Sequence, residues 1–180
     1  LAEKDLPNSI GRLSGFMGNA GVLIRAYVYM RLLGKNGMKR IAEFATLNAN
    51  YLQSRLKNAG FELAFPNRRA THEFIITLKN EQKEFSINAM DFAKSLLDYG
   101  FHAPTIYFPL LISECLLIEP TETETKETID SFVDAMAQIL DNAKTKNTNH
   151  KEAPFNMPVS RVDELQAARN LDLTYKEIIE

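Results

Sequence analysis

The stretch GFHAPTIYFPLLISECLLIEPTETET, residues 100–125, carries the clearest information about the fold. Gly100 is suited to end a helix, and Pro104 and Pro109 favour an extended course, because proline disfavours helical geometry in itself and in the residue before it. The apolar run over residues 115–118 predicts a buried strand, and Thr125 predicts the cap of a following helix. Polar side chains are therefore expected at both ends of this strand, at the rim of a sheet.

Outward from this stretch the sequence predicts more helices and two more strands. Helices over residues 21–33 and 38–59, ended by Gly34 and Gly60, are expected to form a helical hairpin. Strands are expected over 61–65 and 73–78, followed by a polar turn. The remaining expected elements are helices over 88–99, from Thr125 onward and over 162–169, with a mobile polar stretch over 141–149. This order predicts an α+β fold in which helices cover a small, mostly antiparallel sheet.

Composition narrows the classes of partner. The 180 residues contain 21 Lys and Arg against 23 Asp and Glu, without a basic block, so nucleic acid is not an expected partner. The longest apolar stretch, residues 22–33, is short and contains Arg25 and Arg31, so no membrane span is expected. Cys115 is the single cysteine, which excludes an internal disulfide and fits a reducing cytoplasm.

Several motifs together resemble the C-terminal part of glycine decarboxylase, the P-protein of the glycine cleavage system. They are GNAGVLIRAY at 18–27, LNANYL at 47–52, THEFI at 71–75, HAPT at 102–105 and EPTETE at 119–124. The uninterrupted TIYFP at 105–109 and PVSRVDELQAAR at 158–169 resemble the separate second subunit more than the long single-chain form. This family consists of pyridoxal-phosphate enzymes with the aspartate aminotransferase fold, fold type I.

The resemblance implies a division of the chain and a set of partners. Residues 1–36 correspond to a lead-in and interdomain helix of the large domain, 37–143 to the small α+β domain, and 144–180 to a C-terminal tail. The implied parent decarboxylates glycine with pyridoxal 5'-phosphate and transfers the aminomethyl group to the lipoyl arm of the H-protein. Its partners are the cofactor-binding large domain, the first P-protein subunit and the lipoylated H-protein.

The Schiff-base lysine of the family has no counterpart in the sequence. In the family this lysine follows a histidine and precedes a glycine-rich loop, whereas the only His-Lys pair here is His150-Lys151 and no glycine follows Gly100. Lys151 is interpreted as a solvated tail lysine. The isolated chain is therefore expected to bind no cofactor covalently and to be inactive. The alternative function is a non-catalytic interaction module or subunit-interface domain, and a bare apolar stripe on the helix at 21–33 predicts self-association.

Two groups of site residues are predicted. Gly18 and Asn19 precede a helix, where free N–H groups favour a phosphate, so they are candidates for the cofactor phosphate; a plain helix cap is the alternative. His72, His102, Thr105, Glu119 and Thr121 are candidates for the wall of the substrate channel. Both histidines also suit a purely structural loop role, and Glu122 and Glu124 suit compensation of the next helix dipole.

The sequence favours neither a metal site nor an arginine for a substrate carboxylate. The three histidines lie far apart without acidic residues at ligand spacing, so no metal site is expected. Many aminotransferases hold the substrate carboxylate with an arginine near the strand-to-helix junction, and residues 117–121 contain none. A decarboxylase gains from this difference, because a cation there stabilises the ground state more than the transition state.

Overall fold

A computed structural model describes residues 7–11, 14–15 and 17–172 of the chain. The chain forms two compact units, Leu1–Ile41 and Ala42–Glu180. The expected lead-in and tail thus lie partly outside the described residues. Within the described part, no helix has both the length and the apolar character that crossing a bilayer requires.

The first unit contains the beginning of helix α1 (Ala20–Asn58). Asn19 caps this helix, since its side-chain Oδ1 accepts a hydrogen bond from the N–H of Val22 at 3.2 Å. Helical geometry lapses at Gly34, which has a φ of 60° that glycine adopts without steric cost. The label α1 thus covers two helical segments that meet in a kink at Gly34, where the sequence predicts a helix end, and the second segment begins directly after Gly34 instead of at Met38.

The second unit is built on a four-stranded antiparallel sheet with the strand order β1-β2-β4-β3. The strands are β1 (Glu62–Leu63), β2 (Phe74–Thr77), β3 (Thr105–Ile106) and β4 (Cys115–Ile118). Phe74 pairs with Ile118, and Thr105 pairs with Leu117. The beginning of β2 and the end of β4 consequently lie next to each other at one end of the sheet, where residues 72–73 lie beside residues 119–120.

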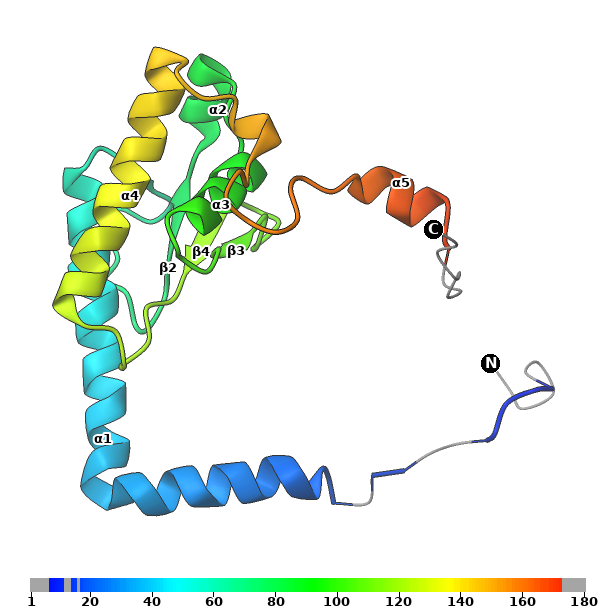
Figure 1. Cartoon of the computed structure of the whole chain (residues 1–180). Coiled ribbons are helices and arrows are strands. Elements are labelled where there is room, and N and C mark those ends of the chain that lie inside the picture. The colour runs from blue at the N-terminus through cyan, green and yellow to red at the C-terminus, as the bar shows by residue number, and fades with distance from the viewer. Residues whose placement is uncertain (1–6, 12–13, 16, 173–180) are drawn as a thin grey trace. The chain divides into compact units, whose positions relative to one another are not determined.

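Helices α2 (Lys79–Phe85), α3 (Ala89–Asp98) and α4 (Lys126–Thr145) complete this unit with the later part of α1 (Figure 1). Their apolar faces and the sheet share one core, whose largest fully buried side chains include Phe92, Leu56, Ile76, Leu116 and Met136. Phe92 meets Phe61 edge to face, with ring centroids 5.9 Å apart. These observations confirm the predicted α+β class with a small antiparallel sheet.

Three local predictions need correction. The polar turn expected after β2 is helix α2, and Glu81 in its first turn is buried. The mobile stretch expected over 141–149 is wrong, because α4 continues to Thr145 and buries Ala143. A 3-10 helix, η2 (His150–Glu152), follows, and its His150 is buried against α3. The last expected helix is confirmed in shorter form as α5 (Glu164–Arg169).

Candidate functional site

A pocket of about 610 Å³ opens where the loop after α3, the end of β4 and the first turns of α4 meet. The polar candidates His102, Thr105, Glu119 and Thr121 all line it. Leu52, Ile129 and Phe132 supply an apolar floor. The structure thus brings together four of the five residues predicted for a substrate channel. Their contact with substrate stays a prediction.

The loop that carries His102 is anchored at the end of α3. Gly100 adopts a φ of 78°, and the N–H of Phe101 donates to the carbonyl of Leu96 at 3.1 Å, so the helix ends where the sequence predicts. Phe101 then packs edge to face on Phe132 of α4, with centroids 5.3 Å apart. This aromatic contact fixes the base of the loop, while His102 itself stays exposed at the pocket.

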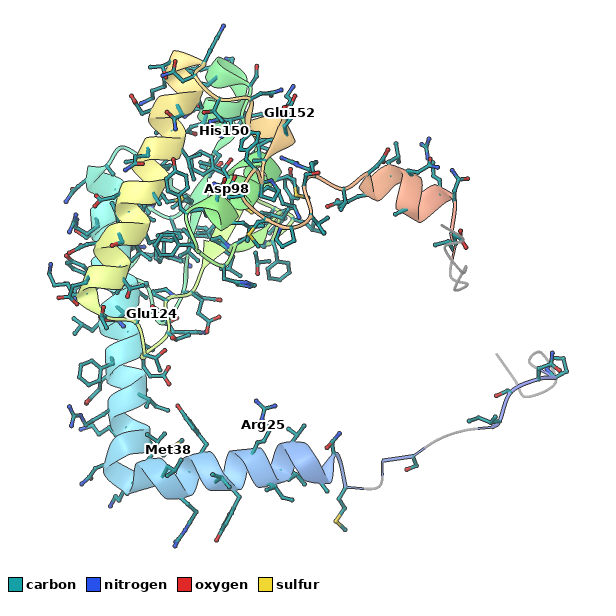
Figure 2. All side chains as sticks on the ribbon, in the orientation of Figure 1. Arg25, Met38, Asp98, Glu124, His150 and Glu152 are labelled. Atoms are coloured by element: carbon teal, nitrogen blue, oxygen red, sulfur yellow. The ribbon has the colours of Figure 1, made fainter. Side chains whose placement is uncertain are left out.

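The opposite wall is the turn between β4 and α4. The Nδ2 group of Asn48 on α1 donates to the carbonyl of Thr121 at 2.9 Å and to that of Glu124 at 3.1 Å. Figure 2 shows Glu124 at this turn. The hydroxyl of Thr125 accepts from the N–H of Thr128 at 3.2 Å and caps α4 as predicted. The turn is therefore held by Asn48 of α1 and by the cap of α4.

The formally charged residues described around the pocket are acidic. Glu119 and Glu124 line it, and among the residues described around it there is no lysine or arginine. Residues 117–121 contain no arginine, and none of the other residues described around the pocket supplies one. Such a wall offers carboxylates and hydroxyls to a ligand but no fixed cation to a ligand carboxylate.

His72 lies next to the pocket rather than in its lining. Pairing of β2 with β4 places His72 and Glu73 beside Glu119, so that one ligand atom of each lies within 4.8 Å of the others. His72 and Glu73 are neighbours in sequence, whereas Glu119 follows a distant strand, so ligand spacing along the sequence does not reveal this trio. His72 and Glu119 are exposed and Glu73 is half-buried. A nitrogen and two carboxylates of this kind can ligate a divalent cation.

Gly18 and Asn19 belong to the other unit of the chain. Gly18 has a φ of 115°, and its N–H donates to the carbonyl of Gly15 at 2.8 Å. The cap formed by Asn19 uses its Oδ1 atom, so its Nδ2 group can still donate to a ligand. The first turn of α1 contains no acidic residue that would repel an anion. The turn fits a phosphate, but this role stays a prediction.

Sequence reasoning missed two asparagines that shape the site. Asn48 holds the turn between β4 and α4, and Asn50 forms a reciprocal pair with Ala70, donating to its carbonyl at 2.8 Å and accepting from its N–H at 3.2 Å. Asparagine is a poor residue in a helix interior. Two of them in one turn of α1 were the available signal for a tertiary role.

Lysines of the described residues do not suggest an imine-forming site. Lys151 is exposed, as predicted. Lys126 donates to Asp130 at 2.6 Å, and hydrogen bonds to Asp130 and Tyr51 raise the pKa of the Lys126 ammonium above its ordinary value. A raised pKa keeps the amine protonated, whereas imine formation needs the neutral amine.

Comparison with known proteins supports the motif-based resemblance. The family of glycine dehydrogenase C-terminal domains matches residues 41–159. A probable glycine dehydrogenase (decarboxylating) subunit 2 from Thioalkalivibrio sulfidiphilus is 64% identical over 176 residues, which are 98% of this chain and 36% of the relative. The protein with the same description from Coxiella burnetii is 62% identical over 178 residues, 99% of this chain and 36% of its own length. The chain thus spans about a third of the length of these relatives.

One solved structure shows the same fold. It is glycine decarboxylase (P-protein) of the glycine cleavage system in an inhibitor-bound form, with a TM-score of 0.58 and 20% sequence identity. The match covers 70% of this chain and 28% of that chain. The predicted relation to a P-protein fold is therefore confirmed at the level of fold.

Proposed function

The chain belongs to the family of glycine dehydrogenase C-terminal domains, and from this membership we propose that it works as the C-terminal part of a glycine dehydrogenase (decarboxylating) subunit 2. In the proposed whole protein, glycine is decarboxylated and its aminomethyl group passes to the lipoyl arm of the H-protein. Pyridoxal phosphate, when bound there, supplies the electron sink for the carbanion that decarboxylation leaves. The proposed partners are the cofactor-binding large domain, the first P-protein subunit and the H-protein.

The structural observation that supports this proposal is the common pocket of His102, Thr105, Glu119 and Thr121. These residues come from two segments that the sequence separates and the sheet joins. We infer that they form a wall of the substrate channel, with the hydroxyls orienting the ligand and the apolar floor excluding water. The missing cation suits a wall from which a carboxylate is lost, because no ion pair holds that carboxylate in the ground state.

The cofactor role proposed for this chain is limited to the phosphate. Gly18 and the Nδ2 group of Asn19 are proposed to meet it at the beginning of α1, where helix N–H groups favour an anion. The proposed division into residues 1–36 of the large domain, 37–143 of the small domain and a tail over 144–180 places this turn in the large domain. We also propose a cytoplasmic location, which the unpaired, buried thiol of Cys115 supports.

The alternative, an interaction module, is supported by the exposed apolar side chains at the beginning of α1. Leu23, Ile24 and Tyr27 are about 60% exposed, and Leu32 is 80% exposed. A helix this apolar on its accessible surface indicates an interface. In the proposed whole protein both readings hold together, since a domain that lines a site also needs a surface against the rest of the protein.

The test uses the whole protein with its first subunit and H-protein. Glu119→Gln is expected to lower glycine-dependent release of carbon dioxide by at least about tenfold, which is about 1.4 kcal/mol of transition-state stabilisation. Glu84→Gln is the matched control, because Glu84 is exposed on α2 and does not line the pocket. Equal rates of carbon dioxide release for the two variants would show that Glu119 does not act in the site.

A further inference from the structure

The chain after α4 folds back onto α3 and is held there by charged groups. Residues 150–161 are called the strap below. Arg161 donates from Nη2 to the Oδ1 atom of Asp91 at 2.8 Å and from Nε to the carbonyl of Ala153 at 2.9 Å. The carboxylate of Asp98 accepts the N–H groups of Phe155 and Asn156 at 2.8 and 2.7 Å. Figure 2 shows Asp98 on α3 and His150 at the beginning of the strap.

His150 is the buried centre of this attachment. It is 7% exposed, and its Nδ1 atom lies 2.9 Å from the Oγ atom of Ser95, which is also buried. The hydroxyl of Ser95 donates its proton to the carbonyl of Asp91 at 2.8 Å, so it has only lone pairs to offer the ring. The ring must therefore donate through Nδ1–H, and the neutral form of His150 carries its proton on Nδ1.

The second ring nitrogen of His150 has no hydrogen-bond partner among the described residues. Nε2 of His150 is buried without a hydrogen-bond partner in the described part of the chain. A proton added there would create a buried cation with nothing to accept its N–H, which is costly. Neutral imidazole is the form that this environment tolerates.

The charges around His150 do not compensate such a cation. On α3, Asp91 is already paired with Arg161, and Asp98 already holds two strap N–H groups. Within the strap, Arg161 donates to the carbonyl of His150 at 3.0 Å and adds a like charge, while Lys151 and Glu152 are exposed. From the loop after β3, Tyr107 interacts with Asp91 and Arg161, and burial raises the pKa of its phenol, so it stays neutral.

We propose that the strap is a pH-sensitive attachment that rests on α3 only while His150 is neutral, so that mild acid releases residues 150–161 and frees the segment bearing α5. The device joins one buried imidazole to the hydrogen bonds that Asp91 and Asp98 of α3 accept from Arg161, Phe155 and Asn156. Nothing in it depends on the proposed enzymatic function.

The direction of the effect follows from the environment of the ring. Burial lowers the pKa of His150 below its ordinary value, and the nearby Asp91 opposes this only in part. A released strap exposes the ring and restores an ordinary pKa of about 6.5. Attachment is therefore strongest above about pH 6.5 and weakens as the pH falls from there toward the lowered pKa, by up to about tenfold in the equilibrium for each unit of difference.

The test follows the ring and the strap together in the 180-residue chain. Long-range ¹H–¹⁵N spectra are expected to show the Nδ1–H tautomer for His150 at pH 7.5. Hydrogen exchange of the Phe155 and Asn156 amides, corrected for intrinsic rates, is expected to accelerate below pH 6.5 in step with titration of His150. Protonation of the ring without loss of this protection, or an Nε2–H tautomer, would overturn the proposal.

A variant separates His150 from the carboxylates that also hold the strap. His150→Gln removes the titration, so the acceleration between pH 6.5 and 5 is expected to vanish, whereas it persists in the controls His72→Gln and His102→Gln, whose histidines are exposed. The same acceleration in His150→Gln as in the wild type would assign it to Asp91 or Asp98 and overturn the proposal. If His150→Gln does not fold, the titration of the wild-type chain alone decides.

Discussion

The side-chain amide of Asn48 lies 2.9 Å from the backbone carbonyl of Thr121, 73 residues further along the chain. This contact ties the middle of α1 to the turn that forms one wall of the pocket. A second hydrogen bond of the same amide, to the carbonyl of Glu124, spans the turn from the end of β4 to the beginning of α4. One asparagine thus defines the shape of a loop that carries two site candidates.

Replacing Asn48 by alanine is expected to loosen this wall. The variant loses two hydrogen bonds to backbone carbonyls, so we expect a loss of about 1–2 kcal/mol in the free energy of unfolding. Urea denaturation measures it. Asn58→Ala is the control, since Asn58 is exposed at the last position of α1 and should change stability by less than about 0.5 kcal/mol. Equal free energies of unfolding for Asn48→Ala and the wild type would show that the Asn48 contact contributes nothing to stability.

Local signals in the sequence predicted much of this fold. Gly100 and Gly60 end helices with positive φ values, Thr125 caps α4, and the apolar run at 115–118 is β4 itself. In each case the deciding interaction lies within a few residues of the signal. Four site candidates also fell into one pocket, because they flank strands of the same sheet.

The elements that were missed depend on contacts distant in sequence. Helix α2 is short and polar, and only the folded core explains why Glu81 is buried in it. The strap is held by Asp91, which lies 70 residues before its partner Arg161. The trio of His72, Glu73 and Glu119 exists only through the register of β2 and β4. Neither composition nor periodicity records such pairings.

The cluster around Asp130 predicts an acid-sensitive link between α1 and α4. Asp130 accepts hydrogen bonds from Lys126, Tyr51 and Arg55, and those from Lys126 and Tyr51 lower the pKa of its carboxyl most. A lowered pKa adds stability above about pH 4, the unfolded value, that is lost as the pH falls through the folded value. Asp130→Asn should therefore lose less stability than the wild type on acidification through this range.

The measurement for this link is the urea midpoint at pH 7 and at stepwise lower pH. Asp141→Asn on the same helix is the control, because Asp141 is exposed. Parallel acid profiles for wild type and Asp130→Asn would show that the cluster does not contribute to the pH dependence of stability.

The exposed apolar side chains of α1 predict self-association of the isolated chain. Val22, Leu23, Tyr27 and Met30 are each at least half exposed, and Leu32 is 80% exposed. Sedimentation velocity is expected to show dimers or larger species, and Leu23→Ser with Leu32→Ser should shift the distribution toward monomer. A sharply monomeric wild-type profile over a wide concentration range would contradict this prediction.

Asn19 offers a test that separates a helix cap from a phosphate contact. In the whole protein, Asn19→Ala is expected to weaken cofactor binding by about one to two decades, from the loss of about 1.5–3 kcal/mol in a charge-assisted hydrogen bond. The cap alone contributes only about 1 kcal/mol to stability.

Asn19→Asp is the matched variant, because aspartate also caps helices but replaces the donor with a negative charge. It should keep the thermal midpoint of the cofactor-free protein and still lose cofactor affinity. Unchanged cofactor affinity in both variants, with a lower midpoint for Asn19→Ala, would make Asn19 a cap only.

The central claim is that this chain contributes walls to a cofactor site whose imine-forming lysine lies elsewhere in the whole protein. Borohydride reduction of the cofactor-loaded whole protein fixes pyridoxal phosphate to that lysine, and peptide mapping by mass spectrometry locates it. We predict a stoichiometric adduct outside these 180 residues, with Lys126 and Lys151 unmodified. A stoichiometric adduct on any lysine of these 180 residues would contradict it.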